Sequence, residues 1–208
     1  MNKRSRNLQR AKSKRPPYDR VLIVSEGSKT EPNYFNDIRM TFRIPSAHVV
    51  AVPSDFGTDP LNVVNFAERR AVASKAFEWV FAVFDRDDHA TYAAALSKAL
   101  KLDSKLKNDE RRPMRFLAIP SVPCFELWLL LHYVDVHALY HRDEVIQRLR
   151  QHLVGYDKGA AGHYNATASM LGVATGRAEK LRQRFTSAGT DPFTAVDEVV
   201  TLLRGLKR

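Results

Sequence analysis

One stretch near the middle of the chain limits the folds that the chain can adopt. Six consecutive apolar residues, Trp79–Phe84, run directly into the polar segment DRDDH, residues 85–89. An apolar run this short, bounded by polar residues, predicts a β-strand that is buried on both faces. Ligands of open α/β sheets bind at the carboxyl ends of the strands, so the acidic segment is the first candidate for a functional site.

Asp85 and Asp87 are two residues apart, and in an extended chain their side chains point the same way, about 6.5–7 Å apart at the backbone. Two carboxylates held together raise each other's pKa unless a cation lies between them. The cations that suit carboxylate oxygens are Mg²⁺ and Mn²⁺. An acid at a strand end can instead cap the next helix, and Asp87 or Asp88 could cap a helix over residues 90–100. Both interpretations stay open for this stretch taken alone.

Short apolar runs alternate with helical periodicity along most of the chain. Strands are expected over residues 20–25, 48–52, 79–84 and 115–119, and helices over residues 31–42, 59–76, 90–106 and 124–133. Such alternation predicts βαβ units and a mostly parallel sheet flanked by helices. We therefore expect an α/β domain over residues 18–140.

The last third of the chain has a different pattern, because every periodic segment after Arg142 is helical. Helices are expected over residues 143–153, 166–185 and 192–206. We expect this C-terminal region, residues 141–208, to be all helix and to pack on the α/β domain.

Positive charge is concentrated at the start of the chain. The net charge is +10, from 33 basic and 23 acidic residues, and the first 20 residues hold eight Lys or Arg against one acid, Asp19. We expect residues 1–17 to form a flexible basic arm that binds nucleic acid by neutralising phosphates. A solvated, disordered tail is the alternative. The arm residues proposed to contact phosphate are Arg4, Arg6, Lys12, Lys14 and Arg15.

The cysteine content and the lengths of the apolar runs indicate the cellular compartment of the protein. Cys124 is the single cysteine, which excludes an intramolecular disulfide and a cysteine-cluster zinc site and fits a reducing compartment. No apolar run approaches the roughly 20 residues that span a membrane, and the N-terminus has no apolar signal segment. We expect a cytoplasmic protein without a membrane partner.

A glutamate occupies a position equivalent to that of the two aspartates. Glu26 directly follows the first expected strand, as Asp85 and Asp87 follow the central one. The carboxyl ends of parallel strands lie at the same edge of a sheet, so the three carboxylates could converge. Such a group can hold one or two divalent ions, which activate water and stabilise the charge of a phosphoryl transition state.

Extended motifs around these acids resemble known families. The segments IVSEG and VFDRDDH resemble the two signatures of Toprim domains, which occur in topoisomerases, primases and nucleases of the OLD family. Three segments in order, EGSKTEPNYF, VFDRDDH and SVPCFELWLLLH, resemble the RloB family, which is associated with restriction-modification and phage-defence loci. The resemblance covers about residues 20–135 well and continues weakly through Tyr156, Lys158 and residues 191–194.

The resemblance implies a Toprim-like sheet and assigns roles to particular acids. Glu26 matches the glutamate that acts as a metal ligand or general acid/base, and Asp85 and Asp87 match the Mg²⁺-binding pair. Glu126 lies in an apolar segment, where a buried carboxylate is costly unless it is paired or coordinated. The family motif favours Glu126 as a further ligand or base, and a first-turn acid that complements the helix dipole is the alternative. Val122 stands where the family pattern has an asparagine.

Five further residues are weaker candidates. Lys29 and Arg86 could hold a phosphate beside the metal. Glu31 could contribute to the site or act only as an acid at a helix start, and His89 could donate a proton or be an ordinary turn residue. Lys158 lies in a glycine-bounded loop, which is more often a linker than a site.

The expected function is a nuclease that uses Mg²⁺, or Mn²⁺, to hydrolyse phosphodiester bonds of DNA or RNA in defence against phage or other foreign nucleic acid. The alternative is a non-catalytic subunit of a defence system that binds nucleic acid or senses a partner. A partner protein from the same locus, such as an ATPase, is also expected. The chain itself has no G-x-x-x-x-G-K-[ST] motif, so the sequence does not support a P-loop ATPase.

Overall fold

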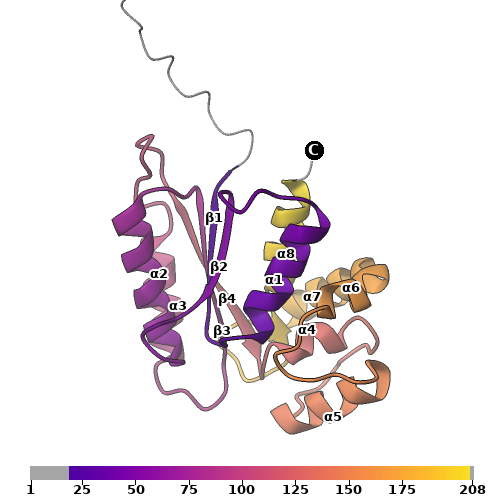
Figure 1. Ribbon diagram of the computed structural model, residues 1–208. Coiled ribbons are helices and arrows are strands. Elements are labelled where there is room, and N and C mark those ends of the chain that lie inside the picture. Colours follow the sequence, from indigo (N-terminus) through magenta and orange to yellow (C-terminus); the bar gives the residue numbers. More distant parts are fainter. Residues whose placement is uncertain (1–18, 207–208) are drawn as a thin grey trace, which may run out of the picture.

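The computed structural model describes residues 19–206, and these form a five-stranded sheet with helices on both faces (Figure 1). The strands, in their order across the sheet, are β2 (Val49–Pro53), β1 (Val21–Ser25), β3 (Trp79–Asp85), β4 (Arg115–Val122) and β5 (Phe193–Thr194). Strands β1 to β4 are parallel, and β5 is antiparallel to β4. The prediction of a mostly parallel sheet flanked by helices is confirmed.

The helices form two layers around the sheet. They are α1 (Thr30–Thr41), α2 (Pro60–Ser74), α3 (Tyr92–Leu102), α4 (Glu126–Leu130), α5 (Arg142–His152), α6 (His163–Thr167), α7 (Leu171–Arg184) and α8 (Val196–Gly205). Helices α2 and α3 cover one face, and α1 and α8 cover the other (Figure 1). Within residues 19–206, no helix combines the length and apolarity needed to cross a bilayer.

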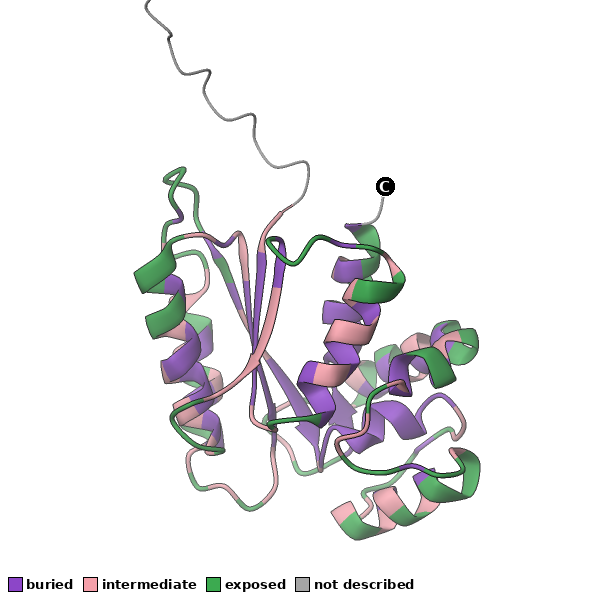
Figure 2. Ribbon diagram, viewed as in Figure 1, coloured by how far each residue is buried: buried purple, intermediate pink, exposed green. Residues whose placement is uncertain are grey.

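The central strands owe their position to their apolar sequence. All five residues of β1 are buried, and in β3 only Trp79 is partly exposed (Figure 2). Strand β3 lies between β1 and β4, and helix α2 packs on it. Successive strand residues point to opposite faces of a sheet, so the unbroken burial of residues 80–85 means that both faces of β3 are covered. The predicted strand is confirmed, and its burial on both faces is confirmed for residues 80–84.

Several boundaries differ from the sequence prediction: the strand expected over residues 115–119 extends to Val122, and the helix expected over residues 124–133 is limited to Glu126–Leu130. Tertiary contacts explain two further differences. The helix expected over residues 90–106 ends at Leu102, since the Asp103 carboxylate accepts the backbone N–H of Phe116 at 2.9 Å and ties the helix end to β4. The prediction that the C-terminal region is all helix is wrong at β5, where Phe193 and Thr194 pair with the end of β4. A strand of two residues is too short for an alternating pattern to reveal.

The helix expected over residues 166–185 is also divided. The structure has α6, a 3₁₀ turn over Ala168–Met170, and then α7. A 3₁₀ turn is a common connector between α-helices, and it does not interrupt the apolar positions that periodicity detects.

The burial pattern predicts a large difference between two leucines. Leu22 in β1 is fully buried, whereas the Leu100 side chain in α3 is 78% exposed. Leu22→Ala should lower the free energy of unfolding by about 2–5 kcal/mol, because it leaves a cavity in the core. Leu100→Ala should change it by less than about 0.5 kcal/mol. Urea denaturation measures both, and equal losses would contradict the assignment of β1 to the core.

Candidate metal centre

The parallel register brings Glu26 and Asp85 together. Ser25 at the end of β1 lies beside Val83 of β3, and the Glu26 backbone N–H donates to the Val83 carbonyl at 2.9 Å. The Glu26 carboxylate then turns toward the end of β3, where its Oε2 accepts the Asp85 backbone N–H at 3.0 Å. Two strand ends therefore place these carboxyl groups at one edge of the sheet.

Asp87 reaches the same edge through an unusual backbone conformation. Its φ is +33°, in a region that residues other than glycine rarely occupy. Helix α3 begins only at Tyr92, and its N-cap residue is Thr91, without a side-chain cap. Neither Asp87 nor Asp88 caps this helix, so the capping interpretation of the acidic segment is wrong.

An outer group of ligand atoms lies at the mouth of the site. Glu26, Asp87 and His89 each offer one oxygen or nitrogen atom, and these atoms lie within 4.8 Å of one another. The Nε2 atom of His89 is 3.6 Å from Oε1 of Glu26. All three residues are half-buried, so the group is open to solvent on one side.

An inner group of carboxylates lies behind it. Asp85, Glu31 and Glu126 are 4%, 6% and 1% exposed, and such burial of charge is costly. Burial raises the pKa of Asp85 well above its usual value, and repulsion from Glu31 and Glu26 raises it further. Burial also raises the pKa of Glu31 to about 7, with added repulsion from Glu126 and Glu26.

The position of Glu31 depends on a glycine. A Cβ atom at Gly27 would lie 2.1 Å from Oε2 of Glu31, so a side chain at Gly27 would displace this carboxylate from its place. Among the described residues, Oε2 of Glu31 and Oε2 of Glu126 are buried without a hydrogen-bond partner. Buried oxygens of this kind are the donors that a divalent cation uses.

Two cations from the C-terminal region face these acids. Arg142, the first residue of α5, forms an ion pair with Oδ2 of Asp87 and lies 3.6 Å from Oδ2 of Asp85. Lys158 Nζ lies 3.7 Å from Oε1 of Glu126, and the same oxygen accepts the hydroxyl of Tyr156 at 3.0 Å. The negative charge of the site is thus partly balanced from within the chain.

Sequence reasoning missed Arg142 and Tyr156. Both are distant in sequence from the acids that they contact. Arg142 belongs to no motif, and Tyr156 belongs only to the weak part of the family resemblance, which assigns it no role. One signal could have revealed Arg142: a cation at the first position of a helix opposes the helix dipole, so its side chain is expected to have an acidic partner elsewhere.

The other predicted site residues have three different outcomes. Lys29 lines the same cavity as the acids, and Gly159 packs against its aliphatic stem. Arg86 instead donates to the backbone carbonyls of Ala188, at 2.9 Å, and Gly189. The arm residues Arg4, Arg6, Lys12, Lys14 and Arg15 lie outside the described residues.

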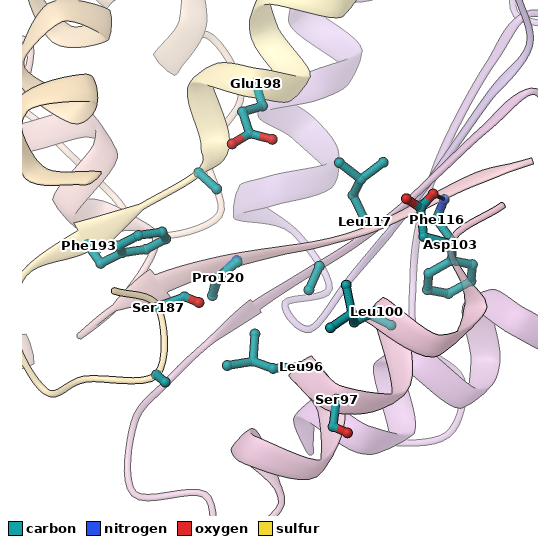
Figure 3. Close-up of a pocket in the computed structure, with 14 residues that line it drawn as sticks. Leu96, Ser97, Leu100, Asp103, Phe116, Leu117, Pro120, Ser187, Phe193 and Glu198 are labelled. Carbon is teal, nitrogen blue, oxygen red and sulfur yellow. Dashed lines mark hydrogen bonds between the residues drawn. The ribbon is translucent and has the colours of Figure 1, made fainter. Parts of the chain in front are cut away.

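Four of the acids, Glu26, Glu31, Asp85 and Asp87, line a cavity of about 500 Å³. The fold has another hollow of similar volume, about 530 Å³, between α3, β4, β5 and the start of α8 (Figure 3). Leucine and phenylalanine side chains, including Leu96, Leu117 and Phe193, line that second hollow (Figure 3). Of these two hollows, the first alone combines carboxylates with a histidine and cations, so chemistry rather than size distinguishes them.

The raised pKa of Glu31 predicts how stability depends on pH. Folded Glu31 keeps its proton up to about pH 7, whereas in the unfolded chain it titrates near its ordinary value of 4.5. The stability that this proton contributes is therefore fully present below pH 4.5 and is lost as the pH rises through 7.

Urea denaturation in EDTA should accordingly show lower stability at about pH 8 than at about pH 5, with at most about 3 kcal/mol of the difference due to Glu31. Glu31→Gln should reduce the difference. Glu179→Gln, which removes an exposed acid, should leave it unchanged. A difference of the same size in wild type and Glu31→Gln would show that Glu31 is not buried as a neutral acid.

Comparison with known proteins gives one match. A family model described as RloB-like protein matches residues 21–203. A search of curated proteins found no match, and a search of solved structures found none either. The matched range includes every acid and cation of the site described above.

Proposed function

The chain belongs to the RloB-like family, and on that premise we propose that it is a metal-dependent nuclease that hydrolyses phosphodiester bonds of DNA or RNA. Defence against phage or other foreign nucleic acid is its proposed role. The observation that supports the proposal most is the convergence of five carboxylates at the carboxyl edge of the sheet. They are Glu26, Glu31, Asp85, Asp87 and Glu126.

The donor set fits Mg²⁺ or Mn²⁺. Both ions take oxygen ligands from carboxylates, and two buried carboxylate oxygens of the site have no partner among the described residues. The Toprim signatures that the chain resembles assign the metal to Glu26, Asp85 and Asp87. In the proposal, Asp85 contributes its negative charge beside the ion, while its Oδ1 accepts the Phe125 backbone N–H at 2.8 Å. A bound ion of this kind supplies a water molecule of lowered pKa and stabilises charge on the phosphoryl group.

Residues of the chain are placed for the remaining tasks. Glu31, with its pKa raised to about 7, suits proton transfer near neutral pH. Glu126 remains the candidate base of the family motif, and its Oε2 atom is unpartnered. Arg142, Lys158 and Lys29 line the cavity, where they can bind phosphate oxygens of a polynucleotide.

The proposal extends to relatives, partners and location. A Toprim relation is part of it, because the glutamate and the Asp-x-Asp pair follow neighbouring parallel strands. Nucleic acid is the proposed substrate, and an ATPase from the same locus is a proposed partner. A cytoplasmic site of action agrees with the single cysteine, Cys124, which is free and buried.

Isosteric substitutions at the site test the nuclease proposal. Asp87→Asn and Asp85→Asn should each reduce cleavage by about 100-fold or more, because the first weakens a proposed metal ligand and the second removes a negative charge beside the metal. The assay should offer single-stranded DNA, double-stranded DNA and RNA, each with Mg²⁺, Mn²⁺ or EDTA.

The control is Asp88→Asn, which removes an exposed acid between Asp87 and His89. This variant should cleave like the wild type, and urea denaturation should show that all three variants are folded. Normal cleavage by Asp87→Asn would place the reaction elsewhere.

One observation favours a second function. Arg142 and Lys158 pair with the acids, so the fold can balance much of this charge without a metal. The acids would then be structural, and the chain would be a non-catalytic subunit that binds nucleic acid or senses a partner. Its basic N-terminal segment would then provide the affinity for nucleic acid.

Deletion of residues 1–17 tests that function. The segment contains seven Lys or Arg and no acid, so the deletion should weaken binding and reduce the slope of log K against log salt by up to about 6. Fluorescence anisotropy over a series of salt concentrations measures the slope. Wild-type binding with this salt dependence and no cleavage would favour the second function, whereas an unchanged slope would exclude the segment from binding.

A further inference from the structure

The ligand atoms that remain free at this site do not coincide with the Asp-x-Asp pair. Glu26 uses Oε2 to accept the Asp85 backbone N–H at 3.0 Å, which leaves its Oε1 facing His89 Nε2 at 3.6 Å. Asp87 gives one oxygen, Oδ2, to Arg142. One atom each from Glu26, Asp87 and His89 lies within 4.8 Å of the other two.

Asp85, in contrast, is engaged by the protein. Its Oδ1 accepts the Phe125 backbone N–H at 2.8 Å, and its Oδ2 lies 3.6 Å from the Arg142 guanidinium. The residue is only 4% exposed. These contacts give Asp85 a structural task, since it joins the end of β3 to the segment that begins α4.

An independent observation indicates a cation here. Glu31 lines the same cavity as Glu26, Asp87 and His89, is 6% exposed, and has a buried Oε2 atom without a partner among the described residues. A carboxylate oxygen in that situation is stabilised by a positive ligand in the cavity.

We infer that Glu26, Asp87 and His89 form one metal site and that His89 makes it select Mn²⁺ over Mg²⁺. The inference rests on the proposed function, because it names the cofactor of the same site. Imidazole nitrogen is a good ligand for first-row transition ions, whereas Mg²⁺ prefers oxygen ligands and keeps much of its water. One nitrogen among the oxygens therefore favours Mn²⁺.

His89 has the position that a ligand needs. It lies in the turn before α3, where its carbonyl accepts the Tyr92 backbone N–H at 3.2 Å, and its side chain is 29% exposed. The ring can thus meet an ion from solvent while the turn holds its backbone. If His89 were only an ionic partner of Glu26, its removal would not distinguish Mn²⁺ from Mg²⁺.

Calorimetric titration of the full chain near neutral pH tests the inference, with Mn²⁺ and Mg²⁺ as the probes. His89→Gln should weaken Mn²⁺ binding by about tenfold or more and leave most of the Mg²⁺ affinity. The control is His137→Gln, since His137 is exposed and pairs with Asp135, away from the site. Equal losses for both ions in His89→Gln, or no loss, would overturn the inference.

Pulsed EPR of Mn²⁺ bound to the wild type gives a test that needs no variant. A nitrogen coupling from a directly bound imidazole is expected, and an oxygen-only spectrum would overturn the inference. The result separates the two proposals. Nitrogen coupling without cleavage of DNA or RNA would support this metal site and reject the nuclease. Cleavage without nitrogen coupling would support the nuclease and reject His89 as a metal ligand. Absence of metal binding by the wild type would reject both.

Discussion

Repulsion between carboxylates at the end of the parallel sheet is the interaction on which the rest of this structure depends. Five acids gather there, and three of them, Asp85, Glu31 and Glu126, are buried. Like charges in a low dielectric cannot all remain ionised without cations. The chain responds with protonation at Glu31, whose pKa rises to about 7, and with cations from its own C-terminal region. A divalent ion would relieve the same repulsion more completely.

The C-terminal third is therefore part of the site as well as part of the fold. Helix α5 supplies Arg142, and the loop after it supplies Lys158 and Tyr156. Strand β5 pairs with the end of β4, close to the segment whose backbone holds Asp85. Residues from the C-terminal third thus supply the positive charges that face the carboxylates at the ends of β1 and β3.

The features that could be predicted from the sequence are those that depend on local residue patterns and on the direction of the strands. The apolar runs before Glu26 and Asp85 specify two buried strands, and parallel pairing brings their ends together. The partners of Asp87 could not be predicted, because Arg142 meets it only through the placement of α5. The burial of Glu31 depends on the space above Gly27, and the pairing of β5 depends on its neighbour. Such contacts arise from tertiary packing, and they produce no periodic pattern in the sequence.

Anomalous diffraction from crystals grown with Mn²⁺ would show whether this acidic edge is a metal centre. We expect a strong anomalous peak between the side chains of Glu26 and Asp87, inside the cavity that Glu31 lines. A saturated crystal with no peak at this edge, and with Arg142 still paired to Asp87, would contradict this expectation. In that case the acids serve the stability of the fold and not a bound metal.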